Sequence, residues 1–154
     1  TEDGLYEDAK TAVNFLLNKG VLEQDIILYG ESLGTAVAVE IGQNKDFAGI
    51  ILEAPFTSTI DLAKIHYPYV PEFLVNMVIR DRYASDTVFD SVSAPVMVIH
   101  GQNDSIVPID MGKKIYNMVE GNKSFYTVEG AGHNDTSVIG GESYFNQIME
   151  FIHE

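Results

Sequence analysis

Apolar and polar residues follow two different spacings along this chain. Four stretches are largely apolar and rich in β-branched or aromatic residues: 25–29, 48–54, 95–101 and 124–130. Such runs are typical of strands that are buried on both faces of a parallel sheet. Between them, apolar residues recur every three or four positions, which is the spacing of a helix with one buried face. The sequence therefore predicts strands that alternate with helices.

The polar residues at the ends of these segments indicate where the helices begin and end. Asp3 is the expected N-cap of the first helix, and Gly20 follows its last apolar residue as a C-terminal cap. Residues 57–58 are expected to cap a short helix, and Asp110 the helix that follows the third strand. Helical spacing is clearest at residues 5–17, 33–41, 111–119 and 144–152, and residues 72–79 are apolar on nearly every side.

Strands and helices in alternation predict an α/β fold, a mainly parallel sheet with helices on both faces. The chain has no internal repeat or linker, so residues 1–154 are expected to belong to a single domain. Because crossover connections are right-handed, the carboxyl ends of the strands meet at one edge, where α/β proteins bind ligands. Three polar motifs lie at predicted strand ends: GESLG at 30–34, GQND at 101–104 and GAGHND at 130–135.

The first motif places Ser32 between Gly30 and Gly34, after a strand and before a helix. A sharp turn from strand to helix forces the serine into a strained backbone conformation and raises its Oγ above the sheet. Side chains at positions 30 and 34 would crowd this turn, so glycine is expected at both. The N–H of Leu33, at the start of the helix, can donate to a developing oxyanion. In the alternative interpretation, Ser32 only caps that helix.

The second motif supplies Asp104 and the third supplies His133. A carboxylate can accept a hydrogen bond from the Nδ1–H of a histidine and fix the tautomer of its ring. Histidine on a glycine-rich loop suits a general base, because its ordinary pKa lies near neutrality. Taken alone, Asp104 is better explained as a residue that bonds its own loop. The remaining histidines are expected to be structural or solvated: His66, His100 and His153.

Other acidic residues are weaker candidates than Asp104. Asp135 is too close to His133 in sequence to fold back onto it easily, and Glu129 lies on the last strand. Near the serine, Glu31 and Glu53 are expected to be solvated, as carboxylates at strand ends usually are, rather than to tune the site.

Residues 56–93 do not follow the regular alternation and are expected to wall the substrate pocket. Ligand sites are mostly apolar, and this segment offers six candidate side chains for an acyl-binding surface: Phe56, Tyr67, Tyr69, Phe73, Leu74 and Met77. The alternative interpretation is ordinary core packing under a loop.

The net charge and the lack of cysteine disfavour or exclude several kinds of binding partner and catalytic chemistry. The formal net charge of −14 makes nucleic acids and anionic membranes unfavourable partners. The chain has no cysteine, which excludes disulfides, thiolate metal sites and cysteine catalysis, and no metal site is expected. No apolar run is long enough to span a membrane.

Four motifs in this order, GESLGTAVAVE, LEAPFTS, PVMVIHGQNDSIVP and VEGAGHND, resemble the alpha/beta-hydrolase superfamily. Within it, the chain is similar to small serine hydrolases that include bacterial homologues of the eukaryotic protein-depalmitoylating alpha/beta-hydrolase-domain enzymes. The order serine, aspartate, histidine along the chain is also the order of that superfamily. The resemblance implies that Ser32 is the nucleophile, Asp104 the acid and His133 the base, and it implies no cofactor.

In that family the serine turn lies near the middle of the domain, whereas here it lies at residue 32. We therefore expect this chain to be the C-terminal part of a longer hydrolase domain, with its N-terminal strands missing. Expressed alone, it is expected to aggregate or turn over substrate poorly, because the edge of its first strand is left exposed. The expected location is the cytoplasm, and any N-terminal membrane anchor would lie in the missing part.

The favoured function is hydrolysis of a carboxylic ester or thioester, with a small-molecule or acyl-chain substrate, through an acyl-enzyme. Two alternatives stay open: a serine peptidase of the same fold, and a non-catalytic hydrolase-like scaffold used for binding.

Overall fold

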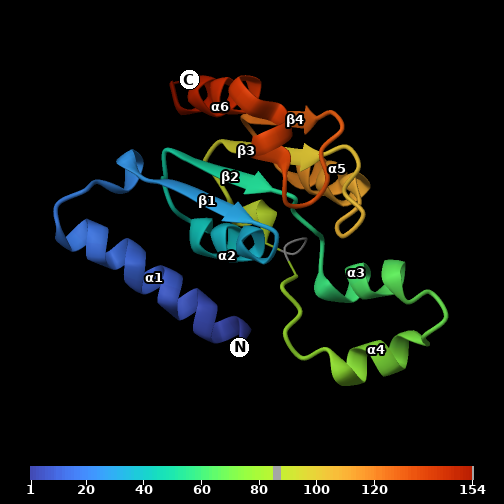
Figure 1. Ribbon diagram of the computed structural model, residues 1–154. Helices are drawn as coiled ribbons and strands as arrows, with labels where there is room; N and C mark the ends of the chain where they lie inside the picture. Colours follow the sequence, from blue (N-terminus) through green and yellow to red (C-terminus); the bar gives the residue numbers. More distant parts are fainter. Residues whose placement is uncertain (85–87, 154) are drawn as a thin grey trace.

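Four parallel strands form one sheet in the computed structural model of the chain, which describes residues 1–84 and 88–153 (Figure 1). Their order across the sheet is their order in the sequence: β1 (Ile27–Glu31), β2 (Gly49–Glu53), β3 (Val96–Gly101) and β4 (Lys123–Val128). The α-helices are α1 (Glu2–Asn18), α2 (Leu33–Gly42), α3 (Thr59–His66), α4 (Glu72–Val78), α5 (Ile109–Met118) and α6 (Thr136–His153). Two short 3₁₀ turns, η1 (Glu23–Asp25) and η3 (Phe89–Ser91), precede β1 and β3.

Helices cover both faces of the sheet. In Figure 1, α2 lies below the sheet and α6 above it, and alternate side chains of each strand pack into two separate clusters. Val96 and Val98 of β3 belong to the cluster that includes side chains of α2 and α5, whereas Met97 and Ile99 belong to that of α6. Every residue of β2 and β3 is buried, which explains their continuous apolar runs. The predicted α/β class, a parallel sheet between helices, is therefore confirmed.

Two predicted N-caps are wrong, each for a local reason. Thr1, not Asp3, caps α1, since its hydroxyl accepts a hydrogen bond from the N–H of Gly4 while Asp3 lies within the first turn. Pro108, not Asp110, precedes α5, and its φ of −57° already suits the entry into a helix. Gly20 has the left-handed φ of +88° expected just beyond a helix, as predicted.

The last helix begins earlier than its apolar spacing indicates. α6 starts at Thr136 rather than near Tyr144, and Gly141 interrupts it with a φ of +50°. This interruption rotates the first turns relative to the rest, so a single helical period does not describe the whole element. The early start brings Thr136 to the edge of the sheet that carries the polar motifs.

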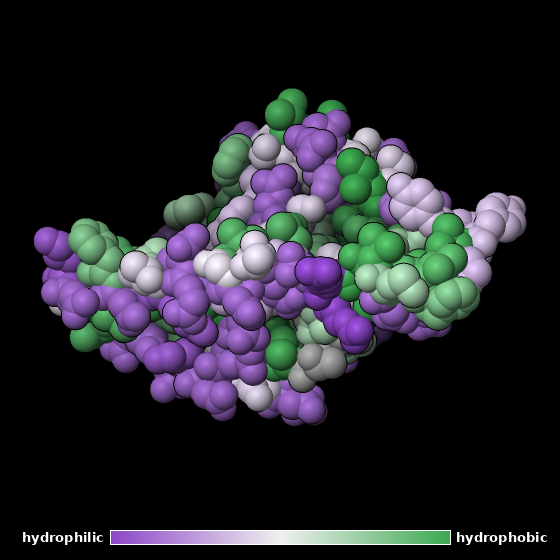
Figure 2. Space-filling model, turned by 90° about the horizontal axis from the view of Figure 1, so that it is seen from below, coloured by the Kyte–Doolittle hydropathy of each residue, from purple (hydrophilic) through white to green (hydrophobic). Residues whose placement is uncertain are grey.

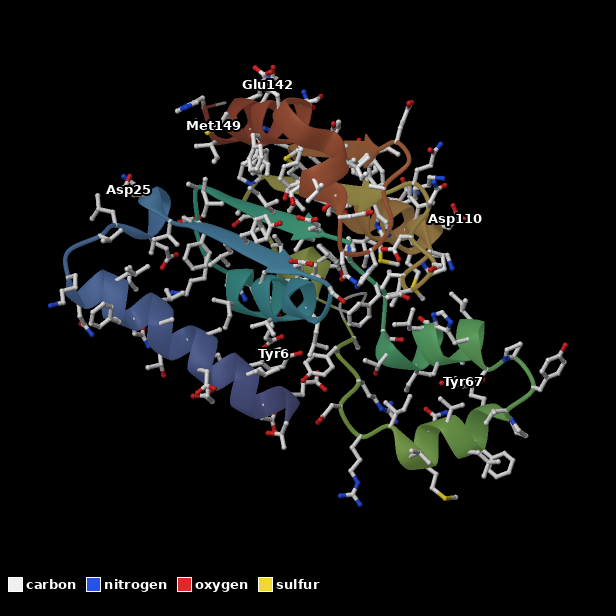
Figure 3. All side chains as sticks on the ribbon, viewed as in Figure 1. Tyr6, Asp25, Tyr67, Asp110, Glu142 and Met149 are labelled. Atoms are coloured by element: carbon white, nitrogen blue, oxygen red, sulfur yellow. The ribbon has the colours of Figure 1, made fainter. Side chains whose placement is uncertain are left out.

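The helices α3 and α4 form an arm that projects away from the sheet (Figure 1). Ser58 caps α3 by accepting a hydrogen bond from the N–H of Asp61, which confirms the cap expected at 57–58. Figure 2 shows apolar residues gathered over this arm, and Figure 3 labels Tyr67 on it. Of the six apolar side chains that were expected to wall a pocket, Phe56 is buried in the core and five are exposed: Tyr67, Tyr69, Phe73, Leu74 and Met77. Residues 85–87 of the predicted pocket wall lie outside the described residues.

The sheet is more open at its β1 edge. α1 packs against α2 and has no buried residue, and a groove of about 590 Å³ separates it from the edge of β1. Apolar side chains line the groove, among them Leu5, Leu16 and Leu28. Within the described residues, β1 pairs with β2 on one side only. None of the helices described combines the length and the hydropathy that crossing a bilayer requires.

Candidate active site

Ser32 occupies a strained turn between β1 and α2. Its backbone has φ of +51° and ψ of −115°, a conformation that costs a residue other than glycine about 1–3 kcal/mol. Three hydrogen bonds hold it there: the Ser32 N–H donates to the carbonyl of Glu53 (2.9 Å), and the Ser32 carbonyl accepts from the N–H (3.0 Å) and the hydroxyl (2.6 Å) of Thr35. The predicted sharp turn from strand to helix is therefore present. The Ser32 side chain makes no capping bond to α2, contrary to the alternative that it only caps that helix.

The two glycines of this turn have different roles. A Cβ atom on Gly30 would lie 2.2 Å from the carbonyl oxygen of Gly34, so no side chain fits at position 30. A Cβ on Gly34 would meet no described atom within 4 Å, and Gly34 lines the open groove beside α1. The expectation that crowding requires glycine at position 34 is wrong for the residues described, because a Cβ there would point into open space. Leu33 is the first residue of α2, so its N–H has no carbonyl partner one helical turn earlier.

Asp104 follows β3 and uses its two carboxylate oxygens separately. Oδ1 accepts hydrogen bonds from the N–H groups of Ile106 (2.9 Å) and Val107 (2.8 Å). Oδ2 lies 2.7 Å from Nδ1 of His133. The side chain of Asp104 is fully buried. One oxygen thus organises its own loop, as the alternative interpretation expects, and the other faces the histidine.

His133 links the carboxylate to the serine. Its Nε2 lies 3.1 Å from Ser32 Oγ, and its Nδ1 bonds Asp104 on the other side of the ring. An ionised Asp104 accepts at Oδ2 as it does at Oδ1, and in that state the Nδ1 of His133 carries the proton. Nε2 then carries a lone pair that can accept the proton of the Ser32 hydroxyl. The structure brings these three predicted residues together over the carboxyl edge of the sheet.

The loops that carry Asp104 and His133 are bonded to each other. The N–H of Asn103 donates to the carbonyl of Ala131 (2.8 Å), and a Cβ on Gly101 would lie 2.2 Å from the carbonyl of Gly132. Asp135 bonds the N–H of Gly132 (2.7 Å), so it closes the His133 loop instead of serving as the acid. The close approach at Gly101 is a requirement that the sequence analysis did not recognise, although the glycine at a strand end is the kind of signal that marks one.

The three other histidines lie where a structural or solvated role was expected. His66 and His153 are exposed, and His66 bonds the carbonyl of Ile106 at 2.7 Å. His100 is completely buried beneath the Asp104 loop, with Nε2 2.8 Å from the carbonyl of Val107 and 3.5 Å from Asp104 Oδ2. Burial holds the pKa of His100 below its ordinary value, so the ring is neutral and donates from Nε2.

The two glutamates near Ser32 behave differently from each other. Glu31 is exposed, as predicted, and Glu129 is exposed as well. Glu53 has only 4 % of its surface exposed, and the expectation that it would be solvated is wrong. Hydroxyl groups of neighbouring side chains surround its carboxylate, which the sequence pattern alone did not reveal.

A strained serine between a parallel strand and a helix, with an aspartate and a histidine at later strand ends, defines an alpha/beta hydrolase. The family model of the prolyl oligopeptidase family matches residues 1–154, and the chain belongs to this family. Human alpha/beta hydrolase domain-containing protein 17B is 28% identical over 153 residues, which cover 99% of this chain and 50% of that protein. The chain spans about half the length of the curated relatives it matches.

Solved structures show the same fold. An alpha-beta hydrolase from Vibrio vulnificus superposes with a TM-score of 0.80 at 22% identity, covering 98% of this chain and 57% of that one. The esterase Pf2001 from Pyrococcus furiosus superposes with a TM-score of 0.69 at 21% identity, covering 95% of this chain and 59% of that one. The chain therefore has a partial alpha/beta-hydrolase fold.

Proposed function

We propose that the complete protein containing this chain is a serine hydrolase that cleaves carboxylic esters or thioesters through an acyl-enzyme. The observation that supports this proposal is the continuous line of hydrogen bonds from Asp104 Oδ2 through His133 to Ser32 Oγ, with distances of 2.7 and 3.1 Å. A general base has to lie within this range of the proton it removes.

In the first half of the reaction, Ser32 Oγ attacks the acyl carbon while Nε2 of His133 takes its proton. Asp104 stabilises the imidazolium that forms, because its buried carboxylate faces Nδ1. The N–H of Leu33, at the positive end of α2, donates to the oxyanion of the tetrahedral intermediate. The imidazolium then protonates the leaving alcohol or thiol, and the acyl group stays on Ser32.

In the second half, the same histidine removes a proton from water, which attacks the acyl-enzyme. Collapse of the second tetrahedral intermediate releases the carboxylic acid and returns the proton from Nε2 to Ser32 Oγ. His133 thus passes one proton in each half-reaction: from Ser32 Oγ to the leaving group in the first, and from water to Ser32 Oγ in the second.

A peptidase of the same fold is the second candidate, because the matching family model is that of the prolyl oligopeptidases. Both candidates use the same three residues and differ only in the leaving group. A non-catalytic scaffold is the third candidate, and it is disfavoured by a strained serine within hydrogen-bond distance of a histidine base.

The test compares hydrolysis of p-nitrophenyl acyl esters with hydrolysis of aminoacyl p-nitroanilides by the complete protein. We expect esters to be cleaved faster, and preferential cleavage of the amides would favour the peptidase instead. Labelling with a fluorophosphonate probe reports the reactive serine directly and is expected to disappear in Ser32→Ala. The matched control Ser93→Ala, an exposed serine that bonds the carbonyl of Lys45, is expected to label normally. A folded protein that neither labels nor turns over substrate would indicate the scaffold.

A further inference from the structure

Glu53 is a buried carboxylate at the carboxyl end of β2, next to the strand that leads into Ser32. It is paired in register with Glu31 of β1 on one side and with Ile99 of β3 on the other. Glu31 is exposed, whereas Glu53 has 4 % of its surface exposed. The other residues of β2 are all apolar or glycine, so the carboxylate is an exception in a strand built for packing.

Among the described residues, the hydrogen bonds to this carboxylate all come from hydroxyl groups, and none of the ion pairs there includes it. Thr136 donates to Oε1, and Tyr29 and Tyr144 donate to Oε2, the latter at 2.7 Å. Burial and the carboxylate of Glu53 raise the pKa of Tyr144 to about 12, so its hydroxyl remains a donor. A buried charge without a cation is unfavourable unless hydrogen bonds satisfy it. An apolar side chain would fill the space at less cost, so packing does not explain the carboxylate.

The bonds of Glu53 reach Ser32 itself and the start of α6, just after His133. Its backbone carbonyl accepts the N–H of Ser32 at 2.9 Å. Its side chain binds Thr136, which is 98 % buried and lies three residues after His133 at the start of α6. Tyr29, three residues before Ser32, binds the other oxygen. One residue therefore joins the turn of the serine to the loop of the histidine.

We propose that Glu53 is a positioning residue, whose carboxylate holds the His133 loop in register with Ser32 by anchoring the hydroxyl of Thr136. This inference rests on the proposed serine hydrolase function. The distance from Ser32 Oγ to His133 Nε2 is 3.1 Å, and a displacement of about 1 Å between reacting groups can lower a rate about 100-fold. Asp104 fixes the tautomer of the histidine, and Glu53 fixes where its loop stands relative to the serine.

The rival explanation is that Glu53 only fastens α6 to the sheet. Tyr144 lies further along α6 and also binds Glu53, so the network does contribute to helix docking. The two explanations differ in what they predict for turnover at saturating substrate. Docking alone lowers the melting temperature and leaves kcat of the folded protein unchanged, whereas positioning lowers kcat with little change in KM.

The experiment measures kcat and KM for a p-nitrophenyl ester, the rate of fluorophosphonate labelling, and the melting temperature, all in the complete protein. Glu53→Gln keeps the shape of the side chain and removes its charge. Thr136→Val removes the hydroxyl and Thr136→Ser keeps it. We expect kcat and labelling rate to fall about 10- to 100-fold in Glu53→Gln and Thr136→Val, with KM within about twofold of the wild type. Thr136→Ser is expected to retain at least half of the wild-type kcat.

The matched control is Glu31→Gln, which removes an exposed carboxylate from the register position beside Glu53. Its kcat is expected to stay within about twofold of the wild type. Wild-type kcat in Glu53→Gln, or equal losses in Thr136→Ser and Thr136→Val, would overturn the positioning role while leaving the hydrolase intact. If Glu53→Gln does not fold, the comparison of Thr136→Val with Thr136→Ser tests the positioning role instead. Absence of both labelling and turnover in the wild-type protein would instead reject the proposed function, and the positioning role with it.

Discussion

The two halves of the sheet, β3 and β4 on one side and the edge strand β1 on the other, hold the candidate triad in different ways. On the side of β3 and β4, every residue of β3 is buried, and the loops that carry Asp104 and His133 are bonded to each other. On the side of β1, only Gly30 of the strand is buried, and α1 has no buried residue. Asp104 and His133 are thus held by two loops that are bonded to each other beside a buried strand. Ser32 is fixed by its own turn and by its bonds to Thr35 and Glu53.

Asp104→Asn is expected to have the largest effect, because it acts at the centre of the packed side. The amide keeps the shape of the side chain, but an amide that faces His133 no longer stabilises the histidine with its proton on Nδ1. We expect kcat for a p-nitrophenyl ester to fall about 10⁴-fold in the complete protein. Asp110→Asn, which alters an exposed carboxylate of α5, is the control and is expected to retain normal activity. A loss of less than tenfold in Asp104→Asn would contradict the role given to this acid.

Truncation of apolar side chains compares the packing of the two sides directly. Ile115 of α5 is fully buried against the sheet, and Leu16 of α1 is 38% exposed beside the groove. Ile115→Ala is expected to lower the free energy of unfolding by about 2–5 kcal/mol. Leu16→Ala is expected to lower it by less than about 1 kcal/mol. Urea unfolding followed by circular dichroism measures both, and equal losses would show that the two sides are packed alike.

Substitution of alanine for one glycine on each side of the sheet is expected to have opposite effects on stability. In Gly101→Ala the new methyl group meets the carbonyl of Gly132 at 2.2 Å, so the loop of His133 has to move. We expect a loss of about 1–3 kcal/mol in the free energy of unfolding, together with slower turnover. In Gly34→Ala the methyl group points into open space from the first turn of α2, and a gain of up to about 1 kcal/mol is expected. Destabilisation of Gly34→Ala by as much as Gly101→Ala would refute the difference.

On the side of β3 and β4, a pH effect is expected from His100. Burial holds its pKa in the folded protein below the ordinary value of about 6.5, so below that pH the unfolded chain binds a proton that the folded chain does not. The free energy of unfolding therefore decreases as the pH falls below about 6.5, by at most about 1.4 kcal/mol per pH unit from this residue. Urea unfolding at pH 7 and pH 5 measures the effect. It is expected to shrink in His100→Gln, and an unchanged pH dependence in that variant would contradict the assignment.

The fold could be predicted because each strand and helix leaves its own pattern of apolar residues in the sequence, and this pattern repeats along the chain. Strands buried on both faces give continuous apolar runs, and β2 and β3 follow this pattern throughout. The less regular elements could not be placed as well. Gly141 breaks the period of α6, and Pro108 precedes α5 without a side-chain cap, so neither boundary follows from apolar spacing or capping residues.

The members of the candidate site were found in the sequence because each one stands just after a strand in a glycine-containing motif. The contacts among them were not all accessible in this way. That Gly34 faces open space depends on the direction in which α2 leaves the turn. That Glu53 is buried depends on hydroxyl groups from residues 29, 136 and 144, which lie far from it in sequence and reach it only in the assembled fold.

The hydrogen bond between Ser32 and His133 joins residues 101 positions apart. During synthesis Ser32 leaves the ribosome long before His133, so the two side chains can meet only after the residues of β4 have been added. We therefore expect Ser32 to react with an electrophilic probe only after the chain has been made through His133. A nascent chain halted before β4 is expected not to react.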